Sequence, residues 1–167
     1  MRIFLMSAGK GERLRKYTKD KPKCLLKVGS KVMLQRWMDN FREWRIHDVL
    51  INTSYKSEQV VEYLNNIDWG KMRIALSNEK ELLGTARTLY RNRKFVKGEH
   101  YFGVVYVDVW TTFDMRKMIN YHKKRPCMVT LALHEPRNLK GKGVAVVKDG
   151  LVVDFEEKPR SPKSRYV

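Results

Sequence analysis

The chain has 167 residues, a length that fits one domain of ordinary size. Apolar residues make up 43% and charged residues 32%, a balance that favours a packed core and excludes a disordered chain, which would be poor in apolar residues. Lysine and arginine total 35 against 18 acids, so the net charge is +17 and an anionic partner is favoured. No apolar run approaches the roughly 20 residues that span a bilayer, which predicts a cytoplasmic protein with no membrane partner.

Two apolar runs in the N-terminal third predict buried strands. The first runs from Arg2 to Ser7 and ends at small residues, and the second runs from Asp48 to Thr53. Between them, residues 8–32 show little periodicity and carry nine basic side chains, and a loop of this length is usually functional. Apolar residues then recur at helical spacing from Met33 to Trp44, which predicts an amphipathic helix with a core-facing stripe.

Strands and helices alternate through the middle of the chain. Ser57 is expected to be the N-cap of a helix that reaches Leu64. The run from Arg73 to Ser77 predicts a third strand, and residues 83–92 predict a helix. The strongly apolar and β-branched run from Tyr101 to Val107 predicts a fourth strand.

The pattern changes near the C-terminus. Asp114 is expected to cap a helix that reaches about Lys124. Residues 128–133, 143–147 and 151–155 then predict three strands, of which the last two are joined by a hairpin turn at Asp149-Gly150. These neighbouring strands indicate an antiparallel addition to the preceding βα units.

The order of the elements predicts an α/β fold. We expect a Rossmann-like open mixed, mostly parallel sheet with helices on both faces, followed by C-terminal antiparallel strands, in a single domain over residues 1–167. In such sheets ligands bind beyond the carboxyl ends of the strands. The chemistry is therefore expected in the loops that follow residues 7, 53, 77 and 107.

The loop after the first strand reads Ala8-Gly9-Lys10-Gly11-Glu12-Arg13-Leu14. Glycines two positions apart let the backbone approach a ligand closely and aim its N–H groups at an anion. A third glycine for a dinucleotide fingerprint is missing, and so is the Gly-Lys-Ser/Thr of a Walker loop. Taken alone, this Gly-x-Gly pattern fits an ordinary structural turn.

The longer run AGKGERLRKYTKDKPKCLLKVGSKVML, residues 8–34, resembles the signature of the sugar-1-phosphate nucleotidyltransferases. That family's pattern is Gly-x-Gly-Thr-Arg-Leu-x-Pro-Leu-Thr, followed by Pro-Lys-Pro-Leu and Val-x-x-Lys-Pro. Three later stretches keep the family's order: EKELLGTA at 79–86, VVYVD at 104–108 and FEEKP at 155–159. The loop at 79–86 looks most similar to that of the guanylyl- and thymidylyltransferase types.

The resemblance implies a Mg²⁺-dependent reaction in which a sugar 1-phosphate attacks the α-phosphate of a nucleoside triphosphate, giving an NDP-sugar and pyrophosphate. It implies that Arg13 neutralises the departing pyrophosphate, that Lys23 neutralises the transferred phosphoryl group, and that Asp108 holds the metal. It assigns binding of the sugar phosphate to Glu157 and Lys158. The resemblance also assigns nucleotide binding to six loop residues: Ala8, Gly9, Gly11, Glu79, Gly84 and Thr85.

Each of these residues also has a plain structural interpretation. Asp108 could cap the turn after its strand, Lys23 could be a solvated loop lysine, and Glu157 with Lys158 could be a solvated charge pair. Two other hypotheses stay open for the whole chain: a truncated, inactive nucleotide-binding homologue, and a basic protein of the same fold that binds nucleic acid or another anionic partner. Nucleic acid is less favoured than a nucleotide, because the basic residues crowd the phosphate loop. Formation of a homo-oligomer also stays open.

The sequence departs from the family pattern near the expected site. Arg87-Thr88 replaces a small Gly-Ala pair, and Val107 replaces the glycine before the metal-binding aspartate. The family's enzymes are also longer, and the resemblance implies that a second metal-binding aspartate and further sugar-binding strands come after residue 167. We therefore expect the C-terminal sugar-binding part to be incomplete.

Overall fold

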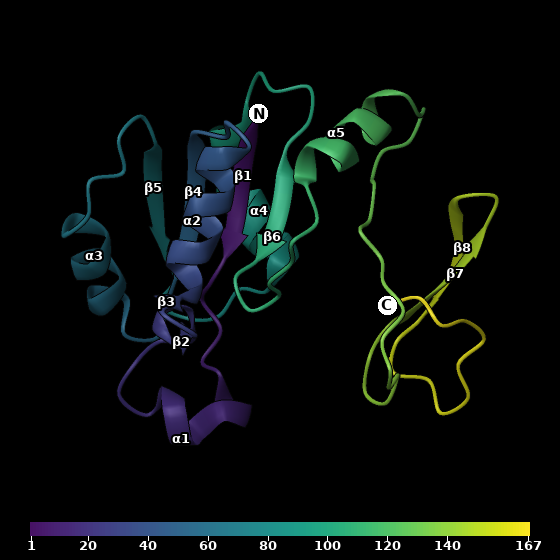
Figure 1. The fold of residues 1–167 in the computed structure, drawn as a ribbon, viewed down its shortest axis with the longest axis horizontal. Helices are drawn as coiled ribbons and strands as arrows, with labels where there is room; N and C mark the ends of the chain where they lie inside the picture. The colour runs from purple at the N-terminus through teal and green to yellow at the C-terminus, as the bar shows by residue number, and fades with distance from the viewer. The chain divides into compact units, whose positions relative to one another are not determined.

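The computed structural model describes residues 1–167 and contains two units, Met1–Phe113 and Asp114–Val167. The first unit is built around a four-stranded parallel sheet (Figure 1). The strand order is β5-β4-β1-β6. In register, Met6 lies opposite both Asn52 and Tyr106, so the carboxyl ends of β4, β1 and β6 meet at one edge of the sheet. The strands are β1 (Arg2–Met6), β4 (Asp48–Thr53), β5 (Arg73–Asn78) and β6 (Gly103–Tyr106).

One face of this sheet is covered by α2 (Met33–Glu43) and α3 (Ser57–Asn65) (Figure 1). The two helices lie side by side, since the Tyr63 hydroxyl is 3.0 Å from Gln35 Oε1. Helix α2 forms where the spacing predicts it, because apolar residues recur along one stripe that the core buries completely. The buried residues of that stripe are Met33, Leu34, Trp37, Met38 and Phe41.

The opposite face is covered by α4 (Thr85–Arg91) and the short helix η3 (Arg93–Val96). Phe4 and Met6 of β1 pack there with Leu50, against Leu89 of α4 and the two apolar residues of η3. Strand side chains alternate between faces, so Ile3 and Leu5, both fully buried, point toward the α2 side. The predicted helices on both faces of a parallel sheet are confirmed.

The segment expected to be an unpatterned loop, residues 8–32, contains five short elements. The Thr18 hydroxyl lies 3.1 Å from the carbonyl oxygen of Gly11 and 3.2 Å from that of Leu14, and these hydrogen bonds fold the loop back on itself. Such short turns leave no periodicity in the sequence. They are η1 (Glu12–Leu14), α1 (Arg15–Thr18), η2 (Lys23–Leu25), β2 (Lys27–Val28) and β3 (Lys31–Val32).

Several boundaries in this unit are shifted by one or two residues, such as those of α4 and β5, and two further differences concern α3 and β6. Helix α3 is preceded by Lys56 in a left-handed conformation, with φ 51°, and Ser57 is its first helical residue rather than its N-cap. The fourth strand pairs only over Gly103–Tyr106, because its ladder with β1 ends where β1 ends.

The second unit contains α5 (Met115–Lys123) and a separate hairpin of β7 (Val144–Lys148) and β8 (Leu151–Glu156). The predicted cap is confirmed, since the Asp114 carboxylate accepts a hydrogen bond of 2.9 Å from the Arg116 backbone N–H. The hairpin turn is also confirmed, with positive φ at both residues of Asp149-Gly150. None of the helices is long and apolar enough to cross a membrane. That residues 1–167 form one domain stays a prediction.

The strand predicted at residues 128–133 is wrong. The segment has no strand structure, and Met128 is 97% exposed. A strand exists only when a neighbour pairs with its backbone, and residues 128–133 have no such partner. An apolar, β-branched run is therefore not sufficient to form one.

An ion pair at the start of the sheet gives the stability a predictable pH dependence. The Arg73 guanidinium donates two hydrogen bonds of 2.6 Å to the Asp48 carboxylate, and they lower the pKa of that carboxyl below its usual range. A lowered folded-state pKa stabilises the fold above the unfolded pKa of about 3.9, and this contribution is lost as the pH falls through the folded value. We expect Asp48→Asn to reduce the free energy of unfolding by up to about 1 kcal/mol at neutral pH and by less near pH 2, measured by urea denaturation.

The matched control for this variant is Glu62→Gln, an exposed acid on α3. It should leave the unfolding free energy unchanged at both pH values. An Asp48→Asn effect of equal size at neutral and acid pH would show that the ion pair is not its source.

Candidate functional site

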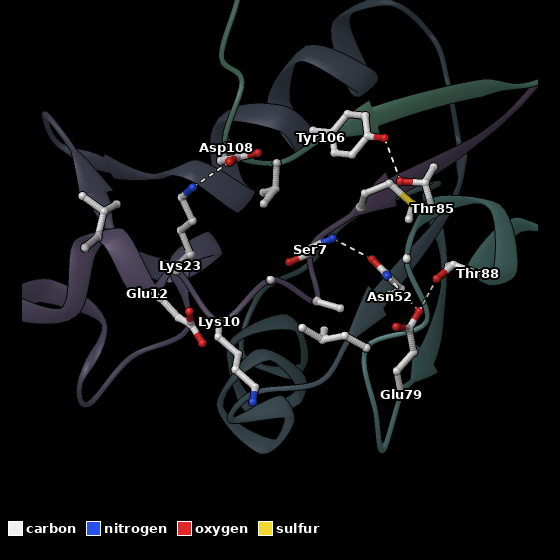
Figure 2. Close-up of a pocket in the computed structure, with 18 of the residues that line it drawn as sticks. Ser7, Lys10, Glu12, Lys23, Asn52, Glu79, Thr85, Thr88, Tyr106 and Asp108 are labelled. Atoms are coloured by element: carbon white, nitrogen blue, oxygen red, sulfur yellow. Dashed lines mark hydrogen bonds and ion pairs between the residues drawn. The ribbon is translucent and has the colours of Figure 1, made fainter. Parts of the chain in front are cut away.

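A pocket of about 780 Å³ opens at the carboxyl edge of the parallel sheet, where the fold class predicts ligand binding. Its walls come from the segments that follow β1, β5 and β6, from Asn52 near the end of β4, and from the start of α4 (Figure 2). All of the predicted catalytic and nucleotide-binding residues line this pocket. They are Ala8, Gly9, Gly11, Arg13, Lys23, Glu79, Gly84, Thr85 and Asp108.

The two glycines of the first loop have different structural roles. Gly11 adopts φ +65°, and a Cβ added there would lie 2.9 Å from Thr18 Cγ2. Gly9 faces open space, with no atom within 4 Å of an added Cβ. Gly11 is therefore required for the fold of the loop, whereas Gly9 leaves room in the pocket.

This difference predicts opposite outcomes for two matched variants. Gly11→Ala should lower the free energy of unfolding by about 1–2 kcal/mol, because it combines a left-handed φ with a steric clash. Gly9→Ala should leave stability within about 0.5 kcal/mol while placing a methyl group in the pocket. Urea denaturation measures both, and equal losses for the two variants would contradict the assignment.

An ion pair joins the glycine-loop segment to the end of β6. Lys23 and Asp108 are separated by 85 residues, yet Lys23 Nζ lies 2.6 Å from Asp108 Oδ2 (Figure 2). Both side chains remain partly exposed at the pocket. The two residues that the sequence singles out for phosphate and metal chemistry are thus in direct contact.

The backbone beside Asp108 is held on two sides. The Val107 N–H donates a hydrogen bond of 3.0 Å to the Met6 carbonyl oxygen. The Val107 carbonyl oxygen accepts a hydrogen bond of 3.1 Å from the indole Nε1 of Trp37. Trp37 belongs to the buried stripe of α2. The position of the carboxylate is therefore set by the core, and the buried Val107 side chain lies where the family pattern has glycine.

Glu79 lies on the pocket wall, but internal donors occupy both of its carboxylate oxygens. Glu79 is 2% exposed, and its Oε1 accepts from Asn52 Nδ2 at 2.9 Å and from the Thr88 hydroxyl. Its Oε2 accepts from the Leu83 backbone N–H at 3.1 Å. Asn52 Oδ1 in turn accepts a hydrogen bond of 2.6 Å from the Ser7 N–H, so one network links the ends of three strands with α4.

The remaining wall is formed at the entry to α4. Gly84 adopts φ +75° and ψ 167°, a conformation that only glycine adopts readily. The Thr85 hydroxyl lies 2.8 Å from the Tyr106 hydroxyl, which orients the half-exposed tyrosine ring at the pocket edge (Figure 2). Leu82, also half exposed, adds apolar surface to the lining.

Two cations of the pocket lining are free of ion pairs. Lys10 and Arg13 line it and are exposed, and neither takes part in an ion pair. Lys23 adds a third cation, whereas the acids are Glu12, the internally bonded Glu79, and Asp108. Free cations beside an accessible glycine backbone are groups that hold phosphates.

Glu157 and Lys158 lie in the second unit, immediately after β8. Lys158 Nζ is 2.9 Å from Glu157 Oε1, and each side chain is 64% exposed. Lys158 adopts a left-handed conformation, with φ 49°. Their binding of a sugar phosphate stays a prediction.

Sequence reasoning missed several residues of the pocket. Asn52 stands at the end of a predicted strand, so the rule for parallel sheets points to its position, although no motif marks it. Thr88 is visible in the sequence only as a departure from the family pattern. The missed lining residues include Ser7, Lys10, Asn52, Leu82, Thr88 and Tyr106.

Comparison with known proteins identifies what the chain resembles. A model of the nucleotidyl transferase family matches residues 3–167. A D-glycero-α-D-manno-heptose 1-phosphate guanylyltransferase of Campylobacter jejuni is 32% identical over 95% of the chain and 69% of its own length. The chain spans 38%, 69% and 45% of the lengths of the first curated relatives that it matches.

Solved structures share the fold. A Bacillus anthracis protein assigned as a glucose-1-phosphate thymidylyltransferase, in complex with sucrose, superposes with a TM-score of 0.89 at 25% identity, over 99% of this chain and 68% of that one. A UDP-glucose pyrophosphorylase complexed with UDP-glucose has a TM-score of 0.81 at 18% identity, over 99% and 72% of the two chains. These matches confirm the predicted α/β class with its parallel sheet and C-terminal antiparallel hairpin.

Proposed function

The chain belongs to the nucleotidyl transferase family, and from that premise we propose that it serves the transfer of a nucleotide from a nucleoside triphosphate to a sugar 1-phosphate. The single observation that carries this proposal is the contact of 2.6 Å between Lys23 and Asp108 beside the glycine loop. A cation, a carboxylate and a close-approaching backbone meet there at the sheet edge. Relatives named as sugar-1-phosphate guanylyltransferases and cytidylyltransferases support the same reaction class.

In the proposed reaction, an oxygen of the sugar 1-phosphate attacks the α-phosphorus of the triphosphate. The bond between the α-phosphorus and the bridging oxygen breaks, and pyrophosphate leaves with that oxygen. Such chemistry depends on positioning and charge neutralisation rather than on a covalent enzyme intermediate. Arg13 is proposed to neutralise the pyrophosphate and Lys23 the transferred phosphoryl group, and the position of both residues in the pocket lining supports these roles.

The nucleoside part of the triphosphate is proposed to lie against the entry to α4. Gly84 leaves open space, and Leu82 and Tyr106 offer apolar surface suited to a base. Because its oxygens accept three internal hydrogen bonds, Glu79 is proposed to hold this wall in place. Glu157 and Lys158 are proposed to bind the sugar phosphate.

The residues present are compatible with Mg²⁺. Protein-bound Mg²⁺ commonly takes one or two carboxylates and completes its shell with substrate phosphates and water. Asp108 offers one partly exposed carboxylate at the pocket, and no group of three His, Cys, Asp or Glu side chains forms a closed cage. Asp108 would hold the ion, which when bound would neutralise charge on the phosphate oxygens.

The proposal is tested by nucleotide-dependent stabilisation. Thermal unfolding is measured with ATP, CTP, GTP, UTP or dTTP, each with and without Mg²⁺. A ligand at about 100 times its Kd adds about 2.7 kcal/mol, a shift of several degrees in Tm. We expect a shift with Mg²⁺ that is largest for one base, and no shift with any triphosphate would refute the proposal.

Pyrophosphate release with a panel of sugar 1-phosphates separates the two hypotheses that assume nucleotide binding. Release that requires both substrates supports a transferase. Stabilisation by a triphosphate without any release supports the alternative, a nucleotide-binding homologue that does not catalyse transfer.

A further inference from the structure

A second basic surface lies on α4 and η3, outside the pocket. Its residues are exposed and follow one another along the outer face of the two short helices. We call it the α4–η3 surface, and it consists of Arg87, Tyr90, Arg91, Arg93, Lys94 and Lys97.

The helices beneath this surface are anchored by their other face. Thr88 is fully buried, and Leu89, Phe95 and Val96 pack on the core cluster of β1 and β4. Since Arg87, Tyr90 and Arg91 recur at intervals of three and four residues within α4, they share its solvent side, and Lys94 of η3 is also exposed. The basic side chains are thus displayed by a rigid element of the fold.

No acid neutralises these five cations. Residues 86–98 contain none, and the first acid after them, Glu99, already pairs with the N-terminal amine and with Arg2, each at 3.3 Å. The ion pairs of the chain include none of the five. The five cations do not line the pocket either, because the α4 residues in its lining are Thr85 and Thr88.

An aromatic ring lies among the cations. Tyr90 is 69% exposed, and the Arg93 guanidinium lies 4.5 Å from the ring centroid. Arg93 also donates a hydrogen bond of 3.0 Å to the Tyr90 carbonyl, which fixes the pair. A planar ring held among unpaired cations offers a stacking platform beside a path for phosphates.

We propose that the α4–η3 surface binds single-stranded nucleic acid. The cations contact successive phosphates, and the free face of Tyr90 stacks against an unpaired base. A duplex satisfies only the first of these contacts, because its bases are stacked on one another. This surface accounts for part of the net charge of +17 that the pocket does not explain.

The test is fluorescence anisotropy with a labelled oligothymidylate and with a duplex of equal length, over a range of salt concentrations. About five phosphate contacts, one for each cation, predict a slope of log affinity against log salt of about −3.5 for the single strand. R87E/R91E should weaken single-strand binding at least about tenfold and reduce that slope by roughly two-fifths. Tyr90→Ala should remove the preference for the single strand over the duplex.

The matched control is K71E/K117E, which makes the same charge change at exposed lysines elsewhere. It should retain single-strand binding within about threefold. Equal losses in both double variants, tighter binding of the duplex, or no binding at low salt would each overturn the proposal. Triphosphate-induced stabilisation should persist in R87E/R91E, so failure of this inference is distinguishable from failure of the proposed nucleotide site.

Discussion

Asp108→Asn is expected to abolish the Mg²⁺-dependent part of triphosphate binding and to lower any pyrophosphate release by about 100-fold or more. The substitution keeps the size of the side chain but removes its charge, and the pocket has no other exposed carboxylate that contacts Lys23. Thermal unfolding with one triphosphate, with and without Mg²⁺, measures the first effect, and a pyrophosphate assay measures the second.

The partner variant sharpens this prediction. Lys23→Ala should weaken triphosphate binding both with and without Mg²⁺, because it removes a phosphate contact rather than a metal ligand. Asp20→Asn, an exposed loop acid, is the control and should change neither measurement. If Asp108 merely caps the turn after β6, Asp108→Asn will lower stability while the response to Mg²⁺ stays as in the parent chain.

The second large effect is expected at the buried carboxylate. Glu79→Ala should lower the free energy of unfolding by about 3 kcal/mol or more, because Asn52, Leu83 and Thr88 each lose a buried acceptor. Thr88→Ala removes one donor and leaves the others bonded, so its expected cost is about 1 kcal/mol. Urea denaturation measures both variants.

Glu81→Ala is the matched control, since Glu81 is an exposed acid in the same loop, and it should stay within about 0.5 kcal/mol of the parent chain. The outcome also separates two roles for Glu79. A residue that contacts the nucleoside would lose triphosphate affinity with little loss of stability when replaced. The hydrogen-bond network around Glu79 instead predicts a large loss of stability with little loss of triphosphate affinity.

Local pattern predicted the elements that depend on local forces. The stripe from Met33 to Trp44 predicts α2 because an amphipathic helix needs only its own spacing and a face to bury. Asp114 predicts the start of α5 and Asp149-Gly150 predicts the hairpin turn, because caps and turns are short-range contacts. The strand predicted at residues 128–133 is wrong, because a strand also needs a neighbouring strand to pair with.

The pocket could be predicted in outline only. The rule for parallel sheets places ligands at the carboxyl ends of the strands, and the family resemblance selects Lys23 and Asp108 there. The hydrogen bonds from Asn52 and Thr88 to Glu79 could not be predicted, because they depend on which strands are neighbours and on the rotation of α4. Val107 is a similar case, since its backbone is held by Trp37, 70 residues away.

The sequence by itself determined the fold class, the glycine loop and the types of charged residue available for phosphate chemistry. These follow from periodicity and from the properties of single residues. Only the tertiary structure decided that Lys23 contacts Asp108, that Glu79 is occupied by internal donors, and that the cations of α4 and η3 have no acidic partners. The strand order β5-β4-β1-β6 is the physical reason for the first two, because it brings to one edge chain segments that are far apart in the sequence.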